Sequence, residues 1–237
     1  MLRGIYTAAA GMLVQQRRTD VVANNLANAS TTGYKRDVAL VRPFPNLNLH
    51  RTTDGQRMGS LTTGAGIEGI RPQFSPGGVR HTGNPLDLAV EGGFFTVQTP
   101  AGIAYTKAGN FSLDGAGYLV TARGDRVLGT RGPIRIDNAD FTVTEEGDII
   151  VAGEIVDRLA IAELTGDVEK LGDNLFYGQG IPAQEVKVSQ GFLEDSNVNV
   201  VREMVDLITA TRAYEANQRI IQAHDETLGK AVNEMAR

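Results

Sequence analysis

The side chains best able to do chemistry in this sequence are its three histidines and two adjacent pairs of acids. His50, His81 and His224 lie far apart, and no two have the spacing of a metal-binding motif such as H-E-x-x-H. The pairs Glu145-Glu146 and Glu194-Asp195 fall in predicted turns, so we expect solvated surface carboxylates rather than the paired acids of a glycosidase. The sequence has no cysteine and no G-x-S-x-G motif, and it therefore lacks a thiol nucleophile and the serine elbow of hydrolases. We predict no catalytic residue, no metal and no cofactor; an enzyme acting on cell-wall glycan would need an acid pair that these patterns do not reveal.

One glycine-rich stretch has the form of a nucleotide-binding loop. Residues 64–69 (GAGIEG) match G-x-G-x-x-G, with Asp87 downstream where an acid could bind a ribose. Such a loop needs a buried strand before the glycines and a helix after them, so that backbone N–H groups reach the pyrophosphate. Residues 59–63 are not an apolar strand, and Pro72 prevents the helix. We therefore predict an extended, Gly-rich strand with no cofactor.

Composition limits the classes of partner. The 237 residues are 41% hydrophobic and carry a net charge of −5, which is typical of a soluble chain of one or two domains. Lys and Arg are scattered among a larger number of acids, so we expect no nucleic-acid partner. No apolar run approaches the roughly 18 residues of a membrane-spanning helix, so we expect no membrane insertion.

The most regular pattern is at the C-terminus, where residues 199–236 predict one long helix. Its expected packing seam repeats in alternating steps of three and four residues, as in a coiled coil. The seam consists of Met204, Leu207, Thr211, Tyr214, Gln218, Ile221, Asp225, Leu228, Val232 and Met235. Asn199 is the predicted N-cap, and Glu203 lies in the first turn, where the helix dipole favours an anion. An ordinary amphipathic helix docked on its own domain would show a similar pattern.

Residues near the N-terminus predict a second helix with a matching seam. That seam consists of Leu2, Ile5, Ala9, Met12, Gln16, Thr19, Ala23 and Leu26. The helix should end near Asn28, where turn-forming residues cluster. The run from Gly4 to Val14 loosely resembles a cleavable signal peptide, but Tyr6 and Gly11 dilute it and Arg17-Arg18 follows it, so we expect no cleavable signal. Seams at both ends suggest that the two helices pair.

The middle of the chain predicts one β domain. Residues 34–82 should be an extended or irregular connection, with few apolar residues from 46 to 78. Residues 83–190 show short alternating runs separated by turn signals, which is typical of an antiparallel sheet. The predicted strands are 86–90, 94–98, 103–107, 118–121, 127–128, 134–136, 141–143, 149–151, 154–164 and 185–189. The predicted fold is therefore mainly β with long terminal α-helices, which pair as a coiled coil, and one central antiparallel β domain.

Three stretches resemble the bacterial flagellar rod and hook proteins, in particular the basal-body rod proteins. They are residues 83–95 (GNPLDLAVEGGFF) with 105–111 (YTKAGNF), residues 196–199 (SNVN) with 203–205 (EMV) and 212–217 (RAYEAN), and residues 23–28 (ANNLAN) with 32–35 (TGYK). They occur in the family's order and together span nearly the whole chain. Hook proteins carry an additional outer domain for which 237 residues leave no room, so the chain resembles a rod protein. Among rod proteins, its motifs most resemble the distal-rod-like group.

The resemblance implies a structural subunit of the flagellar basal-body rod. Such subunits self-assemble through their terminal helices into a helical axial tube that transmits torque from motor to hook, next to other rod and hook proteins. It also implies export through the flagellar export apparatus without a cleavable signal peptide, and an extracytoplasmic position in the basal body. The implied parts are an N-terminal axial helix (1–33), a connecting segment (34–82), a central β domain (83–190) and a C-terminal axial helix (191–237). The residues expected at the assembly interface are Leu2, Ile5, Met12, Leu26, Met204, Leu207, Tyr214, Ile221 and Leu228.

The same pattern of helices and strands is compatible with a second function. A secreted β-rich binding module with a helical oligomerisation stalk would also combine end helices with a β domain. It would form a small closed oligomer such as a trimer, whereas a rod subunit forms an open helical polymer.

Overall fold

The computed structural model describes residues 2–136, 141–170, 172 and 174–235, which fall into two compact units. The helical unit contains the described parts of 1–27, 37–71 and 199–237, and the β unit contains those of 28–36 and 72–198. The chain therefore passes between the units four times, after residues 27, 36, 71 and 198. No helix among the described residues has the length and apolar content needed to cross a membrane.

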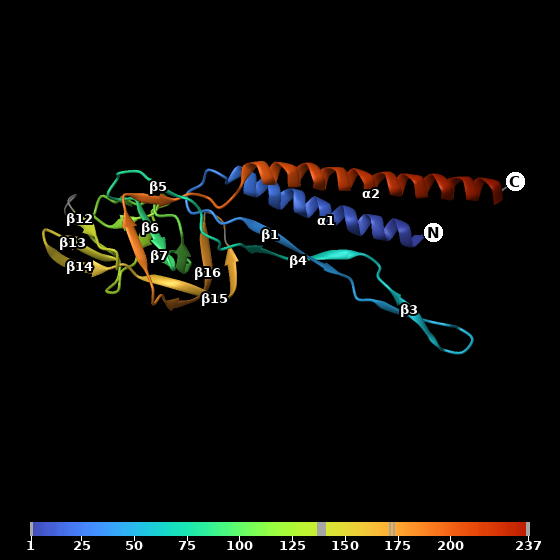
Figure 1. Ribbon diagram of the computed structural model, residues 1–237, viewed down its shortest axis with the longest axis horizontal. Coiled ribbons are helices and arrows are strands. Elements are labelled where there is room, and N and C mark those ends of the chain that lie inside the picture. The colour runs from blue at the N-terminus through green and yellow to red at the C-terminus, as the bar shows by residue number, and fades with distance from the viewer. Residues whose placement is uncertain (1, 137–140, 171, 173, 236–237) are drawn as a thin grey trace. The chain divides into compact units, whose positions relative to one another are not determined.

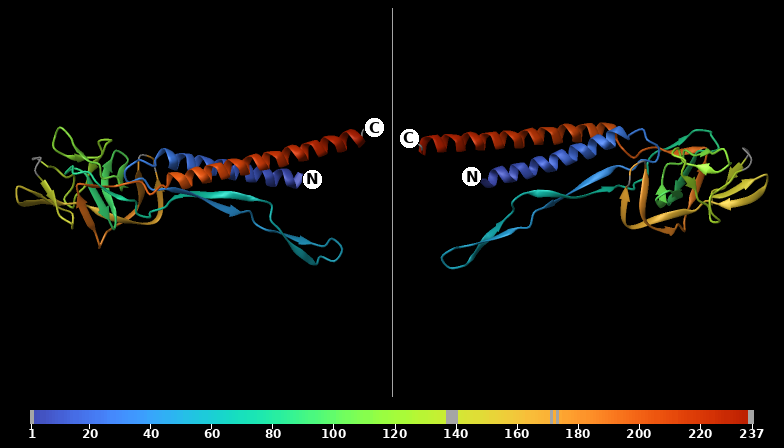
Figure 2. Two further views of the ribbon diagram at one scale, coloured as in Figure 1. Left: turned by 45° about the horizontal axis from the view of Figure 1, so that its top comes forward. Right: turned by 180° about the vertical axis from the view of Figure 1, so that it is seen from behind.

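Two antiparallel helices and a long two-stranded arm make up the helical unit. Helix α1 (Leu2–Ala27) and helix α2 (Val200–Met235) lie side by side in every view (Figure 1, Figure 2). Strand β1 (Asp37–Pro43) pairs with β4 (Ala65–Pro72), and β2 (Leu47–His50) pairs with β3 (Arg57–Leu61). Both helices end within two residues of their predicted bounds, so the two terminal helices are confirmed.

The arm, defined as residues 37–71, departs from the expected irregular connection because it contains regular strands. The residues of these strands are exposed or half-buried and none is fully buried, so the sequence needs no strict alternation of apolar and polar residues, and the strands gave no periodic signal. Residues 65–69 of the GAGIEG stretch lie in β4, which confirms the predicted extended, Gly-rich strand.

A closed ring of four strands forms the centre of the β unit. Strand β7 (Phe94–Thr99) pairs with β8 (Gly102–Thr106) on one edge and with β15 (Ile161–Lys170) on the other. Strand β16 (Leu175–Pro182) pairs with both β15 and β8 and so completes the ring. From β7 the sheet continues through β11 (Arg126–Val127), β10 (Leu119–Val120) and β9 (Ser112–Leu113).

Three smaller groups of strands surround this sheet. Strands β12 (Phe141–Val143), β13 (Asp148–Val151) and β14 (Glu154–Arg158) form an antiparallel meander. Strand β6 (Leu88–Glu91) pairs with β17 (Lys187–Gln190), and β5 (Val79–His81) pairs with β18 (Phe192–Glu194). The last two pairs join residues about a hundred positions apart, so they bring the start and the end of the β unit together.

One apolar core fills the β unit. Phe95 at its centre is fully buried, and its ring meets that of Phe111 edge to face at 5.1 Å between centroids. The core consists of Leu88, Val90, Phe95, Val97, Ala104, Phe111, Leu119, Val127, Ile134, Ile136, Phe141, Val143, Ile149, Leu159, Ile161, Leu175 and Val188. Most of the predicted strands supply at least one of these residues.

The strand predictions fail where the core interrupts a regular pattern. The predicted strand 154–164 is two strands, β14 and β15, because Leu159 between them turns into the core and bridges Gly129. Ile134 and Ile136 are buried, but they flank the isolated bridge at Arg135 and do not form the predicted regular strand. Strand β16 was missed because its sequence, LFYGQGIP, contains two glycines and a proline and resembles a loop.

Replacing Phe95 by alanine should lower the free energy of unfolding of the β unit by about 3–5 kcal/mol, because the substitution leaves a cavity in the core. The matched control is Ile103→Ala on β8, where 56% of the side chain is exposed and a change within about 0.5 kcal/mol is expected. Urea unfolding followed by the near-ultraviolet circular dichroism of tyrosine measures both. Equal losses from the two substitutions would contradict the central position of Phe95.

Candidate assembly surface

The two helices of the helical unit approach each other closely through glycines and small polar layers. A Cβ atom placed on Gly4 would lie 2.5 Å from Nε2 of His224, and one on Gly11 would lie 2.9 Å from Nδ2 of Asn217. Near the C-terminal end of α1, Nδ2 of Asn25 donates to Oε2 of Glu203 at 3.3 Å. Gly4, Gly11 and Asn25 are separated by multiples of seven residues, and so are their partners in reverse order. The antiparallel pair therefore keeps one register along its length.

The layer at Asn25 is buried and polar. Asn25 and Glu203 are both fully buried, and the Asn25 side chain also binds the backbone of Asp37. Its Nδ2 donates to the carbonyl oxygen of Asp37 at 2.9 Å, and its Oδ1 accepts from the backbone N–H of Asp37 at 2.8 Å. An apolar side chain at position 25 could satisfy neither backbone group. Asn25 therefore joins both helices to the first residue of the arm.

The predicted start of α2 is confirmed. Oδ1 of Asn199 accepts a hydrogen bond from the backbone N–H of Arg202 at 3.0 Å, which is the geometry of an N-cap. Glu203 lies in the first turn, as expected. Its carboxylate thus combines a favourable position at the helix dipole with the hydrogen bond to Asn25.

The face of α2 that packs on α1 includes four of the nine predicted seam positions whose burial the structure describes. Leu207, Tyr214, Ile221 and Leu228 are half-buried. Thr211, Gln218, Asp225 and Val232 are exposed, and so is Met204. The positions that alternate with the half-buried residues along the packed face are Glu203, Ala210, Asn217 and His224, each one residue before a predicted seam position. The pattern of three and four is retained, but the face is rotated because the close approach of the helices selects small residues, not large ones.

The remaining predicted interface residues lie on α1. Ile5, Met12 and Leu26 are half-buried. Leu2 is the first residue of α1, and its side chain lies outside the described residues. The buried residues of α1 that the prediction omitted are Ala8, Val14, Val21, Val22 and Asn25.

A stripe of large apolar side chains on α2 is exposed. The apolar stripe consists of Val201, Met204, Val205 and Ile208, which are 71%, 48%, 56% and 53% exposed. Their spacing of three, four and seven residues places them on one helix face, away from the positions that pack on α1. Tyr6 and Leu13 are similarly exposed on α1, at 71% and 64%. Met204 belongs to the predicted seam, but Val201, Val205 and Ile208 lie outside it, although their spacing was visible in the sequence.

The arm exposes further apolar groups. Leu47, Leu49 and Met58 of the β2–β3 hairpin are 56%, 40% and 65% exposed. An isolated two-stranded hairpin is marginally stable in water. One hydrogen bond joins the arm to α1. Oγ1 of Thr7 donates to the carbonyl oxygen of Thr63, between β3 and β4, at 3.3 Å.

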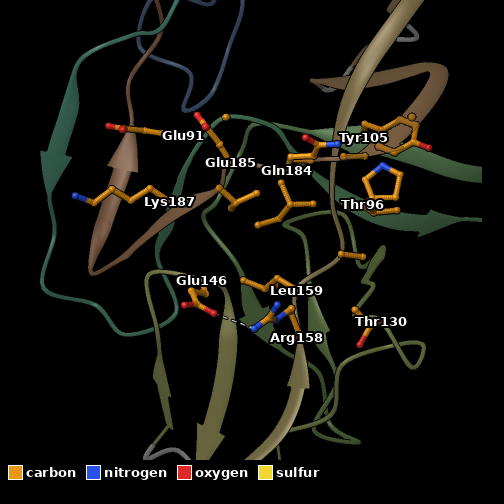
Figure 3. Close-up of a pocket in the computed structure, with 18 residues that line it drawn as sticks. Glu91, Thr96, Tyr105, Thr130, Glu146, Arg158, Leu159, Gln184, Glu185 and Lys187 are labelled. Atoms are coloured by element: carbon orange, nitrogen blue, oxygen red, sulfur yellow. Dashed lines mark hydrogen bonds and ion pairs between the residues drawn. The ribbon is translucent and has the colours of Figure 1, made fainter.

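The described histidines and acids form no cluster that could bind a metal ion. Oδ1 of Asp114 accepts hydrogen bonds from the backbone N–H groups of Ala116 and Tyr118, both at 2.8 Å, so this carboxylate serves a turn. A groove of about 960 Å³ lies in the β unit. Among its lining residues, Arg158 faces Glu146 (Figure 3), with 3.1 Å between Nη2 and Oε2. Arg158 also binds Asp148, and this hydrogen bond lowers the pKa of the Asp148 carboxyl. The carboxylates at Arg158 are thus partners of a surface ion pair.

The two acid pairs differ from each other. Glu146 lies in the turn between β12 and β13 with 77% of its side chain exposed, as predicted for a solvated carboxylate. The prediction is wrong for Glu194, which is 5% exposed in β18 and whose Oε1 accepts a hydrogen bond from Nζ of Lys35 at 2.6 Å. The partner lies 159 residues away, so no local pattern could reveal it.

Comparison with known proteins identifies the family. Sequence models match residues 5–35 (flagella basal body rod protein), 89–151 (flagellar hook protein FlgE/F/G D1 domain) and 189–234 (flagellar basal body rod FlgEFG protein C-terminal). The chain is 34% identical to the flagellar hook-basal body complex protein FlhO of Bacillus subtilis, with all of both chains covered. It is 35% identical to the flagellar basal-body rod protein FlgG of Borreliella burgdorferi, with 98% of each chain covered. The chain belongs to the flagellar basal-body rod proteins. It is also 33% identical to the rod protein FlgF of Caulobacter vibrioides, over 100% of this chain and 99% of that one.

This rod protein is therefore a structural subunit, and the matched segments include its terminal helices. The match at 5–35 contains most of α1, and the match at 189–234 contains nearly all of α2. The relatives are structural proteins, which agrees with the predicted absence of an enzyme active site at the level of the family.

Replacing Gly11 of the rod protein by leucine should destabilise the helix pair by about 1–3 kcal/mol, because the new side chain overlaps Asn217. Gly229→Leu is the control: a Cβ atom on this helical glycine would meet no atom of a neighbouring element within 4 Å, and removing a glycine should stabilise α2 by about 0.5–1 kcal/mol. Thermal unfolding followed at 222 nm reports helix stability. The same change of midpoint in both variants would show that α1 and α2 are not packed at Gly11.

Proposed function

We propose that this protein builds the flagellar rod by packing α1 and α2 of neighbouring copies side by side into a helical tube. The observation that carries the proposal is the apolar stripe on α2, which stays exposed when α2 is packed on α1. Fully burying each such side chain contributes about 1.5–3 kcal/mol relative to leaving it in water. Because the four side chains are already partly buried, the gain per subunit is smaller than four times that figure.

The apolar residues predicted from the seams fit this interface in two ways. Met204 belongs to the exposed stripe and is free to contact a neighbouring copy. Leu207, Tyr214, Ile221 and Leu228, together with Ile5, Met12 and Leu26 on α1, are half-buried in one subunit and would become fully buried between copies. A coiled-coil arrangement of helices from several copies accounts for their spacing.

Charge favours contacts between α1 of one copy and α2 of another. Helix α1 carries Arg3, Arg17 and Arg18 against a single acid, Asp20, whereas α2 carries more acids than bases. Opposite charges at the rim of an apolar contact set orientation more than affinity. The arm, with exposed Leu47 and Leu49, supplies a second surface for a neighbouring subunit.

Such a contact joins one surface of a subunit to a different surface of the next and leaves the assembly open. Head-to-tail contacts that do not close generate a helical filament, which suits a rod that transmits torque from motor to hook. The proposed neighbours are copies of the same chain and other rod and hook proteins. The proposed location is the extracytoplasmic part of the basal body, reached through the flagellar export apparatus without a cleavable signal, with residues 1–33 and 191–237 as axial core and 83–190 as its outer domain.

Replacing Ile208 by aspartate should prevent rod assembly, because each incoming subunit would bury a charge in the helical contact. The matched control is Ile155→Asp on β14, where an isoleucine is 60% exposed, compared with 53% for Ile208. Both variants are produced in the source bacterium lacking its own copy, and hook–basal bodies are counted by electron microscopy. We expect at least a tenfold loss for Ile208→Asp and wild-type numbers for Ile155→Asp.

The proposal is contradicted if Ile208→Asp assembles normally, or if the purified variant has lost the helix content of the wild type, since the stripe would then support the subunit itself. Leu207→Asp provides the contrast. Leu207 is half-buried against α1, so this variant should lower both helix stability and assembly.

A further inference from the structure

The four passages of the chain between the two units enter the β unit through three segments. These are residues 28–36 after α1, residues 72–78 after the arm, and residues 194–198 before α2. These three segments are the covalent connections through which torque can pass between the helical unit and the β unit. How firmly each is held inside the β unit is therefore a functional property of a rod subunit.

A single buried carboxylate binds all three segments. Oε1 of Glu194 accepts hydrogen bonds from Nζ of Lys35 at 2.6 Å and from the backbone N–H of Gly77 at 2.9 Å. Oε2 lies 3.6 Å from Nζ of Lys107 on the β8 side of the core. The backbone oxygen of Glu194 accepts from the N–H of Gly33 at 2.7 Å. Glu194 thus connects the first, second and third segments to one another.

The two lysines extend this cluster to the second segment and to strand β6. Nζ of Lys107 donates to the carbonyl oxygen of Val90 in β6 at 2.7 Å, and Nζ of Lys35 donates to that of Ser75 at 2.9 Å. Lys35 is 1% and Lys107 9% exposed. Burial lowers the pKa of Lys107, although the charge of Glu194 opposes this. Burial would raise the pKa of Glu194, but the Gly77 hydrogen bond and the two ammonium groups outweigh it, so the pKa is lowered and the carboxylate stays charged at neutral pH.

Asn197 forms a second set of connections between the same segments. Its Oδ1 accepts from the backbone N–H of Arg36 at 2.7 Å, and its Nδ2 donates to the carbonyl oxygens of Gln73 and Ser75 at 2.9 and 3.0 Å. The N–H of Gln73 donates to the carbonyl oxygen of Arg36 at 2.8 Å. Arg36, the last residue of the first segment, is therefore hydrogen-bonded to both the second and the third segment.

The first segment is also fixed to strand β15. Nζ of Lys170 donates to the carbonyl oxygen of Lys35 at 3.0 Å and lies 3.7 Å from the centre of the Tyr34 ring. Gly33 has a φ of +67°, and a Cβ there would overlap the backbone of Lys107, so the segment passes where only glycine fits. These contacts leave the segment little freedom to slide.

A charged cluster at this place is not explained by stability alone. Apolar side chains of similar volume often stabilise a buried site as well as an ion pair does. Hydrogen bonds differ from apolar contacts in being directional, so they resist rotation of one segment past another. We infer that Glu194, Lys35 and Lys107, with Asn197, form a torsional lock that holds the three connecting segments as one body and lets the β unit turn with its helices. This inference rests on the proposed torque-transmitting function.

The coupling can be tested on the purified subunit by hydrogen exchange with mass spectrometry. In Glu194→Gln, peptides covering 30–36, 73–78 and 194–198 should all exchange at least tenfold faster, while the core strand β7 keeps its wild-type rate. The control is Asp195→Asn, which removes the exposed ion pair with Arg80 at 3.3 Å. This variant should not accelerate hydrogen exchange in the three peptides jointly. Unchanged exchange, or faster exchange in one segment only, would overturn the lock.

The β7 peptides report in the same experiment whether the variant is folded. If Glu194→Gln does not fold, the double variant Lys35→Met with Glu194→Gln carries the test, because it removes an ammonium together with the carboxylate charge. The same criterion applies to this variant. Faster exchange in all three segments supports the lock, and faster exchange in only one of them overturns it.

A triple variant separates a lock from a merely stabilising cluster. Replacing Lys35, Lys107 and Glu194 by methionine keeps the volume apolar but removes every directional bond that these side chains make. Cells carrying it should contain wild-type numbers of hook–basal bodies yet swim at less than half the wild-type speed in viscous medium. Wild-type speed under load would overturn the lock. Failure of the proposed function itself is distinct, because it appears as normal assembly of Ile208→Asp, whatever the three connecting segments do.

Discussion

The close approach of α1 and α2 is the constraint on which the helical unit depends. Helices can come together at Gly4 and Gly11 only because these residues have no side chain, and the facing His224 and Asn217 fill the space. The packed face is then occupied by small and polar residues, and the large apolar residues of α2 must lie elsewhere. Val205 and Ile208 are exposed because the packed face is occupied by small and polar residues. A subunit built this way leaves large apolar side chains of α2 exposed.

The two units use different interactions because they meet different demands. Apolar contacts between helices have no preferred direction, so neighbouring subunits can be added one after another along a tube. Hydrogen bonds to a buried carboxylate fix distance and direction, so the connecting segments around Glu194 keep their positions under load. Truncating one member of a buried ion pair typically costs about 3–5 kcal/mol, because the remaining charge is left without a partner. This free-energy cost arises from leaving one charge buried without its partner. It does not measure how much the intact cluster stabilises the fold.

Local patterns predicted the elements but not the contacts between distant residues. The helices were predictable because caps and a spacing of three and four are local, and Asn199 acts as the cap that the sequence indicated. The rotation of the packed face was not predictable, because it depends on which residues lie opposite on the other helix. The pairing of the arm strands was not predicted, although its Gly-rich stretch was expected to be an extended strand, because a ribbon without a buried face has no alternation to detect. The mainly β fold and the membership of the rod family could both be predicted from the sequence.

Glu194 shows most clearly where reasoning from local pattern stops. Followed by Asp195 and Ser196, it has the surroundings of a surface turn, yet it is buried while its neighbour Asp195 reaches solvent. Glu194 is the last residue of β18, whereas Asp195 lies just beyond the strand, where its carboxylate pairs with the exposed Arg80. Glu194 is buried because it pairs with Lys35 and Lys107, which lie 159 and 87 residues away in the sequence. A charge can be buried only where partners of opposite sign already converge. In this chain they converge where the connections to the helical unit enter the β unit, so this buried charged cluster lies at the covalent connections between the two units.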